Sequence, residues 1–589
     1  MLLEAIYHRP QDQYAYSFDE NTLHIQLRTK KNDLKEVECI FGDPYDWTDS
    51  HWNNNTLKMG IHYSDNLFDY WFIEIKPPFK RLRYGFKLTS DDKSCVYTEK
   101  GFFEHPPNEI AAYFCFPFLN KIDVFRAPNW VKDTVWYQIF PERFANGDTS
   151  LNPPGTLPWE QEEPTATNFY GGDFQGIIDH FDYLIDLGIS GIYFTPIFKA
   201  SSNHKYDTID YLEIDPQFGD KDTFKRLVKL CHKHGIKVML DAVFNHSGFH
   251  FQPFQDVLTH GKDSIYKDWF HIREFPLKTE PVPNYHTFAF VENMPKLNTE
   301  NEDVKEYLLK VGRYWIQEFD IDGWRLDVAN EIDHQFWREF RHEMKKVKPD
   351  LFILGEIWHD SMPWLRGDQF DSVMNYPFTD CALRYFVQGE IQAIEFSQML
   401  QGYLQRYPKN VNTVLFNLLG SHDTPRMMNI ANFDKEKVKL LLAFQFSFLG
   451  TPCIYYGDEI GLTGEQDPGC RKCMIWDKER QNRDLLEHTK RLIKLRKDYS
   501  IIGNDGDIEL LEANNETNHI TFLKKNDKSQ LIILMNNNNK AQSLPIPLDL
   551  QDKVMIDLWK NEEFSAHANS LSVQLDAFSF AFLLVEDKL

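Results

Sequence analysis

The sequence predicts an α/β protein built around a (β/α)8 barrel, with an N-terminal β-sandwich module, a small inserted subdomain and a C-terminal β-sandwich. Three observations predict this fold. From about residue 130, apolar strand-like runs alternate with amphipathic helical stretches, which is typical of βα units. Eight such strands can be identified before residue 504. Both flanks, residues 1–123 and 505–589, hold short β runs between turn-rich segments.

The N-terminal module, residues 1–123, shows apolar and polar residues in alternation, as strands with one buried face do. Turn-rich residues at 43–55 and 76–78 separate these runs. The expected strands are 23–29, 37–42, 70–76 and 82–88.

The barrel, residues 124–504, has one candidate strand for each of the eight positions of a TIM barrel. These strands are 135–140, 191–198, 236–245, 321–329, 351–358, 370–376, 412–421 and 452–460. Helical stretches lie between them, at 174–187, 223–235 and 304–319 among others. Because about 55 residues follow the third strand before the next helix, we expect an inserted subdomain at about 247–300. The C-terminal β runs are 520–525, 530–536 and 578–586.

Composition and charge argue against several classes of partner and against a membrane or secreted location. The net charge of −24 disfavours nucleic acid and anionic membranes. No stretch of about 20 apolar residues exists, and the first residues lack a secretory pattern. The eight scattered cysteines do not form a disulfide framework, and Cys470-x-x-Cys473, without a second such pair, favours a structural loop. We therefore expect a cytoplasmic protein.

Chemistry is concentrated where the fourth and fifth strands end. Arg325 and Asp327 point to the same side of the fourth strand, so the arginine can hold the carboxylate ionised and oriented, as a nucleophile requires. The fifth strand ends at Glu356 among apolar and aromatic residues, a surrounding that favours a protonated carboxyl. Carboxyls on adjacent strand ends can reach the separation of ~5–5.5 Å that retaining glycosidases use. A structural ion pair between barrel layers is the alternative.

Four segments carry a resemblance to a known family: DAVFNH (241–246), GWRLDVANE (323–331), GEIWH (355–359) and LLGSHD (418–423). Each runs from an apolar strand into charged residues, and together they resemble the fingerprints of the α-amylase family of retaining glycosidases. The resemblance implies that Asp327 is the nucleophile, Glu356 the acid/base and Asp423 a third catalytic carboxylate that stabilises the transition state. It also implies sugar-binding roles for Tyr206, Asp241, His246, Arg325 and His422.

A narrower resemblance rests on MPKLN (294–298), the VANE ending (328–331) and the β-rich N-terminal module. Together they resemble the neopullulanase, cyclomaltodextrinase and maltogenic amylase group. This implies cleavage of α-1,4-glucosidic bonds in cyclodextrins, pullulan and maltooligosaccharides, with transglycosylation as a side activity. It further implies substrate contacts by Asp467 and Arg471, and a role for Glu331 in the choice between water and sugar as acceptor. A glucanotransferase, a sucrose-active isomerase and a non-catalytic glucan-binding protein are the alternatives.

The same resemblance implies a structural Ca²⁺ ion. Hard oxygen ligands suit calcium, and the expected ligands are Asn146, Asp148, Asn152, Gly171 and Asp173. Leu151 departs from the family pattern, where some members carry a further oxygen ligand, and a turn without metal is the alternative.

The N-terminal module, which is starch-binding-like, implies a homodimer. In the resembled group this module closes over the barrel mouth of the partner subunit, which makes a narrow site. Trp47 and Trp52 stand among polar residues. We expect Trp47 to contribute to the partner's substrate site; the alternative is that both indoles cover their own sandwich edge.

Overall fold

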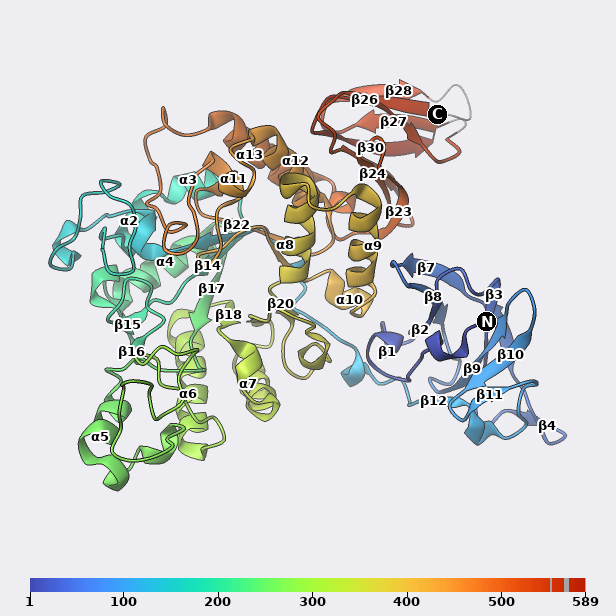
Figure 1. The fold of residues 1–589 in the computed structure, drawn as a ribbon, viewed down its shortest axis with the longest axis horizontal. Coiled ribbons are helices and arrows are strands. Elements are labelled where there is room, and N and C mark those ends of the chain that lie inside the picture. Colours follow the sequence, from blue (N-terminus) through green and yellow to red (C-terminus); the bar gives the residue numbers. More distant parts are fainter. Residues whose placement is uncertain (551–552, 566–570, 588–589) are drawn as a thin grey trace.

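The structure is a computed structural model that describes residues 1–550, 553–565 and 571–587. Three bodies follow one another along the chain, coloured from blue through green and yellow to red in Figure 1. An apolar core shared by the barrel and the red C-terminal strands includes Trp136, Phe444, Phe522 and Phe582. The blue N-terminal strands have a separate core, whose buried residues include Leu23, Ile25, Leu27 and Phe86.

Eight parallel strands form the barrel, as predicted. They are β13 (Trp136–Ile139), β14 (Gly191–Phe194), β17 (Lys237–Ala242), β18 (Gly323–Leu326), β19 (Phe352–Gly355), β20 (Ser372–Val373), β21 (Phe416–Leu418) and β22 (Thr451–Tyr455). Hydrogen bonds join them in the order β20-β19-β18-β17-β14-β13-β22-β21. A parallel bridge between Met374 and Phe416 closes the ring. The ring brings the carboxyl ends of all eight strands to one face, where the active sites of such barrels lie.

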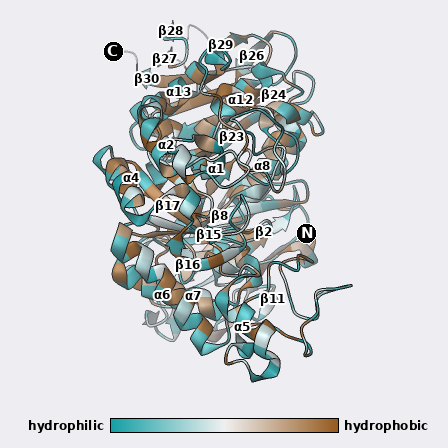
Figure 2. Ribbon diagram, turned by 90° about the vertical axis from the view of Figure 1, so that its left-hand side faces the viewer, coloured by the Kyte–Doolittle hydropathy of each residue, from teal (hydrophilic) through white to brown (hydrophobic). Residues whose placement is uncertain are grey.

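Helices surround the strands; most bury one face, whereas α12 is buried on all sides from Leu440 to Ser447. They include α4 (Lys221–Lys233), α6 (Glu302–Phe319), α7 (His334–Val347), α12 (Lys435–Ser447) and α13 (Arg483–Asp498). Apolar and polar residues alternate along α4, α6 and α7, as the brown and teal bands show (Figure 2). Asp220, Asn301 and Asp333 cap the N-termini of these three helices with side-chain oxygens.

The second predicted strand, 191–198, is interrupted. Pro196 lacks a backbone N–H, so the run divides into β14 and a short strand β15 (Phe198–Ala200). β15 pairs with β16 (Thr208–Ile214) in an antiparallel hairpin that was not expected from the sequence. The loop of this hairpin carries His204 and Tyr206.

The segment after the third strand contains one α-helix, α5 (Gln252–His260), two short 3₁₀ helices at Gly261–Asp263 and Lys267–Trp269, and otherwise mostly irregular chain. An isolated bridge between His246 and Lys296 ties its two ends together, and one between Phe270 and Leu297 joins its middle to its end. It forms a small unit that packs against α6, with α5 at the outer edge of the molecule (Figure 1).

The N-terminal strands form two antiparallel sheets, ordered β1-β2-β8-β7 and β11-β10-β9-β3-β6. In these sheets β1 is Ala15–Ser17, β7 is Gly60–Ser64, β11 is Gly101–Phe103, β10 is Ser94–Thr98 and β6 is Asn55–Lys58. The four predicted strands correspond to β2 (Leu23–Lys30), β3 (Glu36–Gly42), β8 (Phe68–Ile75) and β9 (Leu82–Thr89). The turn-rich segment 43–55 is more ordered than predicted, because β4 (Trp47–Thr48) and β5 (His51–Trp52) pair as a small hairpin.

The C-terminal strands also form a sandwich. One sheet has the order β23-β24-β25-β30-β27-β28, in which β23 is Asp507–Asn514, β27 is Lys553–Asp557 and β28 is Glu562–Ser565. β26 (Gln542–Ile546) pairs with β29 (Leu571–Leu575). The three predicted runs correspond to β24 (His519–Lys525), β25 (Gln530–Asn536) and β30 (Ser579–Asp587).

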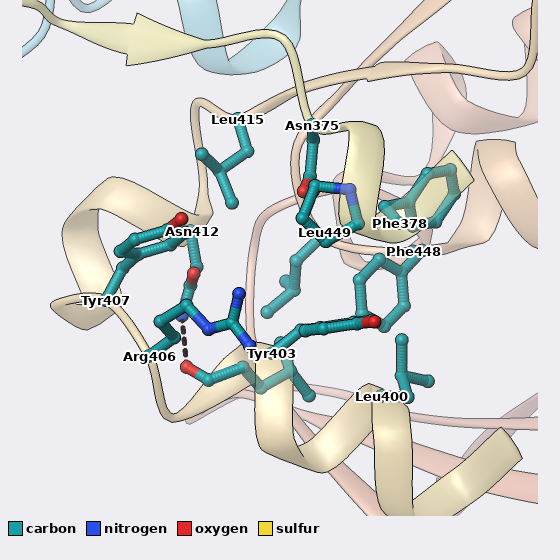
Figure 3. A pocket seen from close by; sticks show the side chains of 12 residues that line it. Asn375, Phe378, Leu400, Tyr403, Arg406, Tyr407, Asn412, Leu415, Phe448 and Leu449 are labelled. Atoms are coloured by element: carbon teal, nitrogen blue, oxygen red, sulfur yellow. Dashed lines mark hydrogen bonds between the residues drawn. The ribbon is translucent and has the colours of Figure 1, made fainter. Parts of the chain in front are cut away.

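A small cavity of about 20 Å³ lies among α8 (Tyr376–Leu383), α9 (Ala393–Leu404) and the chain before β21. Its lining, which includes Leu400, Tyr403 and Phe448, is mostly apolar (Figure 3). That volume holds about one water molecule, so it is a packing defect and no candidate for a substrate site.

Candidate functional site

A cavity of about 590 Å³ lies where the barrel strands end. This volume is within the usual range for ligand pockets. The predicted site residues that line it are Tyr206, His246, Asp327, Glu331, Glu356, His422, Asp423, Asp467 and Arg471. Residues that follow several different barrel strands thus converge on one space, as the barrel topology requires.

Arg325 connects the two central carboxylates. Its Nη1 donates to Asp327 Oδ1 at 2.7 Å, and its Nη2 lies 2.9 Å from Glu356 Oε2. The second contact is an ion pair whose angle is too bent for a hydrogen bond. Glu356 Oε2 also accepts from the Val328 N–H at 2.9 Å, and Oε1 accepts from the Trp358 indole at 3.3 Å. Asp327 and Glu356 are 5% and 6% exposed, so both face the cavity with only their tips.

The electrostatics of Asp327 differ from the sequence prediction. Burial raises the pKa of Asp327 well above its usual range, and the negative charges of Glu356 and Asp241 add to this effect. Arg325 lowers the pKa, as predicted, but a single guanidinium faces three carboxyls and cannot offset the desolvation of Asp327. The ionisation of Asp327 therefore depends on the charges of its neighbours.

Asp241 and Arg325 lie behind the cavity wall and do not line it. Asp241 accepts two hydrogen bonds from Arg325 Nη1, at 2.9 and 3.0 Å. Its Oδ2 also accepts from Tyr193 at 2.6 Å and from Tyr206 at 2.9 Å. Because its oxygens are already occupied and it is 1% exposed, Asp241 supports Arg325 and Tyr206 in place of the predicted sugar contact.

Two neutral histidines form part of the wall. Burial lowers the pKa of His246 to about 3 and that of His422 well below its usual range. The Nε2 of His246 is buried without a hydrogen-bond partner in the described structure, and its ring stacks on Phe288 at 5.2 Å. A buried ring nitrogen without a partner is suited to a ligand hydroxyl.

Asp423 is the most exposed of the three predicted catalytic carboxylates, with 35% of its side chain accessible. Arg471 holds it through Nη2, at 3.2 Å from Oδ1, and holds Asp467 through Nη1, at 2.9 Å. The backbone carbonyl of His422 accepts from Arg471 Nε at 2.7 Å. The predicted Asp467–Arg471 pair is thus brought directly beside Asp423.

Glu331 lies at the rim, with 46% of its side chain exposed. Lys296, in the inserted segment, donates to the Glu331 carbonyl at 3.0 Å and also to Asn245 Oδ1. This lysine ties the inserted segment to the third and fourth strand ends.

Several lining residues were not predicted from the sequence: His204, Phe288, Met294, Asn330 and Trp358. Trp358 is 51% exposed and stacks on Tyr376 at 3.5 Å. Its position two residues after Glu356 was the available signal. His204 had a similar signal, because it lies two residues before the predicted Tyr206. Phe288 had none, because it reaches the cavity through a loop whose path the sequence pattern does not define.

Trp47 does not line the cavity of its own chain. It lies on β4, at the end of the blue module that is remote from the barrel (Figure 1), and is 41% exposed. Trp52 instead packs against Tyr113 at 4.7 Å and donates to the Asp43 carbonyl at 2.9 Å. The two indoles therefore differ: Trp52 covers its own sandwich, and Trp47 is available to another surface.

The five predicted calcium ligands cluster after β13, with their polar atoms largely engaged. Asp173 caps α2 (Phe174–Asp179) and accepts from the N–H groups of Gly147, Asp148 and Gly176 at 3.0, 2.8 and 2.6 Å. Asn146 donates to Asn152 Oδ1 at 3.1 Å, while its own Oδ1 is buried without a partner among the described residues. Exchanging the two ends of the Asn146 amide would turn its oxygen toward Asn152 Oδ1 and the Tyr170 carbonyl oxygen, which now accept from its Nδ2 at 3.1 Å each. The residues therefore fit a weak cation site.

Within the described residues, no group of three or more His, Cys, Asp or Glu side chains is arranged to hold a metal ion. All eight cysteines fall in the described part of the chain and are free thiols. None of the described helices is both long and apolar enough to cross a bilayer.

Three family models match the chain. Residues 138–505 match the catalytic domain of α-amylase, residues 1–120 its N-terminal Ig-like domain, and residues 508–582 the C-terminal domain of maltogenic amylase. The first of these covers more than half of the chain.

Full-length relatives agree with these matches. The chain is 60% identical to a cyclomaltodextrinase of Geobacillus thermopakistaniensis (strain MAS1) over 587 residues, which span 100% of both chains. It is 55% identical to a maltogenic α-amylase of Bacillus acidopullulyticus, over 99% of this chain and 100% of that protein. A solved structure of a cyclomaltodextrinase superposes with a TM-score of 0.95, at 48% identity and with 100% of both chains covered. The chain belongs to the α-amylase family of glycoside hydrolases, in the group of cyclomaltodextrinases, maltogenic amylases and neopullulanases.

Proposed function

We propose that this glycosidase cleaves α-1,4-glucosidic bonds of cyclomaltodextrins, pullulan and maltooligosaccharides with retention of the anomeric configuration. The observation that carries this proposal is the Arg325 guanidinium, which contacts both Asp327 and Glu356 at the base of one cavity. One planar cation holds the two carboxyls at close range, as a retaining mechanism needs. The names of the relatives support the choice of substrates.

The reaction proceeds in two steps. Asp327 attacks C1 of the sugar as the C1–O bond to the leaving group breaks, and Glu356 donates its proton to the departing oxygen. Glu356, now a carboxylate, then takes a proton from water, whose oxygen attacks C1 and releases Asp327. Asp423 and the neutral His246 and His422 bind the hydroxyls of the same sugar, and Asp423 stabilises the positive charge that develops at C1.

NMR of the earliest product tests this scheme. Two inversions at C1 leave an α-anomer, so the α-anomer signal should appear before mutarotation. A first product in the β-anomer would mean a single displacement and would overturn the proposal.

Glu331 supports transglycosylation as a side activity. Its carboxylate lies at the rim near Asn330, where an acceptor would enter. Replacing it with Gln should change the ratio of transfer products to hydrolysis products from maltotriose. A wild-type enzyme that forms only transfer products would favour a dedicated glucanotransferase.

A structural calcium ion is a second part of the proposal. The unpartnered Asn146 Oδ1 and the contact of the same amide with Asn152 support it within the described residues. The ion would join the loop after β13 to the start of α2, and the carboxylate chemistry does not need it.

We also propose a cytoplasmic homodimer in which the N-terminal module covers the partner's cavity. The exposed Trp47 supports this arrangement, and the free thiols suit a reducing compartment. A two-fold interface is reciprocal, so each module would narrow the other subunit's site and exclude bulky starch.

A further inference from the structure

Gln138 lies directly behind the cavity wall and has no part in the scheme above. It belongs to β13, is 1% exposed, and its Nε2 is 2.8 Å from His422 Nδ1. The two residues are 284 positions apart. A buried side chain that contacts a wall histidine from behind can control the proton of its ring.

His422 is neutral in this environment. Burial lowers its pKa well below the usual range, and the positive charges of Arg471 and Arg325 act in the same direction. A neutral imidazole donates from one ring nitrogen and accepts at the other. The partners of the two nitrogens therefore decide which one carries the proton.

The contacts of Nε2 determine which ring nitrogen of His422 carries the proton. Tyr206 Oη lies 2.7 Å from His422 Nε2 and 2.9 Å from Asp241 Oδ2. Asp241 already accepts from Arg325 and Tyr193, so as a carboxylate it can only accept the single proton of Tyr206. The Tyr206 oxygen is then left to accept from His422 Nε2–H.

A second acceptor near Nε2 supports the same hydrogen-bond direction, from His422 outward. Asp423 Oδ2 lies 3.2 Å from the same Nε2, and a lone pair there would face a carboxylate oxygen. With the proton on Nε2, Nδ1 is an acceptor, and the amide NH₂ of Gln138 must be its donor. Hydrogen bonds then run in one direction, from Gln138 through His422 and Tyr206 to Asp241.

We propose that Gln138 is a positioning residue that fixes His422 in the Nε2–H tautomer, so that the ring presents an N–H donor to the sugar-binding cavity. The proposal rests on the proposed function only for the identity of the ligand. A sugar hydroxyl that replaces Tyr206 Oη as the acceptor of this N–H would be held beside Asp423, on the sugar whose C1 reacts.

NMR of protein labelled with ¹⁵N-histidine tests the tautomer without any assay. Comparison with a His422→Gln spectrum identifies the His422 signals among those of the other histidines. We expect a protonated, pyrrole-type Nε2 and an unprotonated, pyridine-type Nδ1. A protonated Nδ1 in the wild-type protein would overturn the proposal, whatever the outcome of the anomer experiment.

Substitution of Gln138 tests its role as a positioning residue. Gln138→Met keeps the length of the side chain but removes the donor, so His422 should populate both tautomers and kcat/KM for maltotriose should fall about tenfold. Gln138→Glu should move a proton onto Nδ1 in the NMR spectrum. Unchanged His422 signals and an unchanged kcat/KM in Gln138→Met would refute the role.

Gln445→Met is the matched control. Gln445 is also 1% exposed, and its Nε2 donates to the carbonyls of Asn417 and Cys453, both at 2.9 Å. It does not line the cavity, so this variant should lower Tm while kcat/KM stays within about twofold. Equal losses of kcat/KM in the two methionine variants would assign Gln138 a purely structural role.

Discussion

Arg325 Nη1 lies 2.7 Å from Asp327 Oδ1, and the two residues are only two positions apart on the chain that leaves β18. The same nitrogen reaches Asp241, so one cation is shared by carboxyls from two adjacent strands. The position of Asp327 therefore depends on a guanidinium that also serves a second buried carboxyl.

Asp327→Asn and Glu356→Gln should each reduce kcat on the order of 10⁴-fold, because each removes a group that acts in the transition state. The fold should be retained. Burial raises the pKa of Asp327, so its charge costs stability at neutral pH, and Asp327→Asn should leave Tm unchanged or higher. Substantial activity in a folded Asp327→Asn protein would rule out this residue as the nucleophile.

Arg325→Met should destabilise the fold by about 3–5 kcal/mol, because buried carboxyls lose the cation that they share. Urea unfolding at pH 7 measures this difference. Arg338→Met is a control, since Arg338 pairs with Asp368 at 2.7 Å on the surface. Such exposed pairs contribute about 1 kcal/mol or less. Similar losses in both variants would contradict the buried network.

Glu459 should make stability depend on pH. It is fully buried, accepts from Tyr137 and Tyr183 at 2.8 and 2.5 Å, and burial raises its pKa to about 7. Because the pKa of Glu459 is higher in the folded state, its protonated carboxyl stabilises the fold at pH values below the unfolded pKa of 4.5. This contribution is lost as the pH rises toward 7. Glu459→Gln should remove roughly 2–3 kcal/mol of the fall in unfolding free energy between pH 5 and pH 8. Glu163→Gln, at an exposed carboxyl, is the control and should leave the fall in unfolding free energy between pH 5 and pH 8 unchanged.

Calcium should raise Tm without changing activity. A ligand that binds only the folded state stabilises it according to its concentration relative to Kd. Thermal unfolding in chelator and in millimolar Ca²⁺ measures the effect, and Asn146→Ala should abolish it. An identical Tm in both solutions would mean that the site binds no calcium.

Trp47→Ala should lower turnover of cyclodextrin more than that of starch, with Tm unchanged, because Trp47 is exposed on its own chain. Trp52→Ala is the matched control and should lower Tm, because Trp52 packs on Tyr113. Removal of residues 1–123 should give a monomer with the same change in preference. A full-length protein that sediments as a monomer and still prefers cyclodextrin would contradict the dimer.

The sequence by itself determined the barrel and the catalytic candidates. The alternation of apolar strands with amphipathic helices is a local pattern, and each of the eight barrel strands overlaps its predicted range, although the second range, 191–198, divides into β14 and β15. Asp327, Glu356 and Asp423 could be predicted because each follows a strand end, and parallel strands in a barrel end on one face. Asp467 and Arg471, which the family resemblance implied as substrate contacts, lie beside Asp423.

Only the tertiary structure decided which side chains lie behind the wall of the substrate cavity and what they contact. Asp241 was predicted as a sugar contact, yet Arg325, Tyr193 and Tyr206 occupy its oxygens. The pKa of Asp327 depends on how deeply its carboxyl is buried, and no local sequence pattern determines that depth. Gln138 meets His422 from a strand 284 positions away. Hydrogen-bond direction and desolvation arise from neighbours in space, so the sequence specifies the groups that react, and packing specifies their protons and orientations.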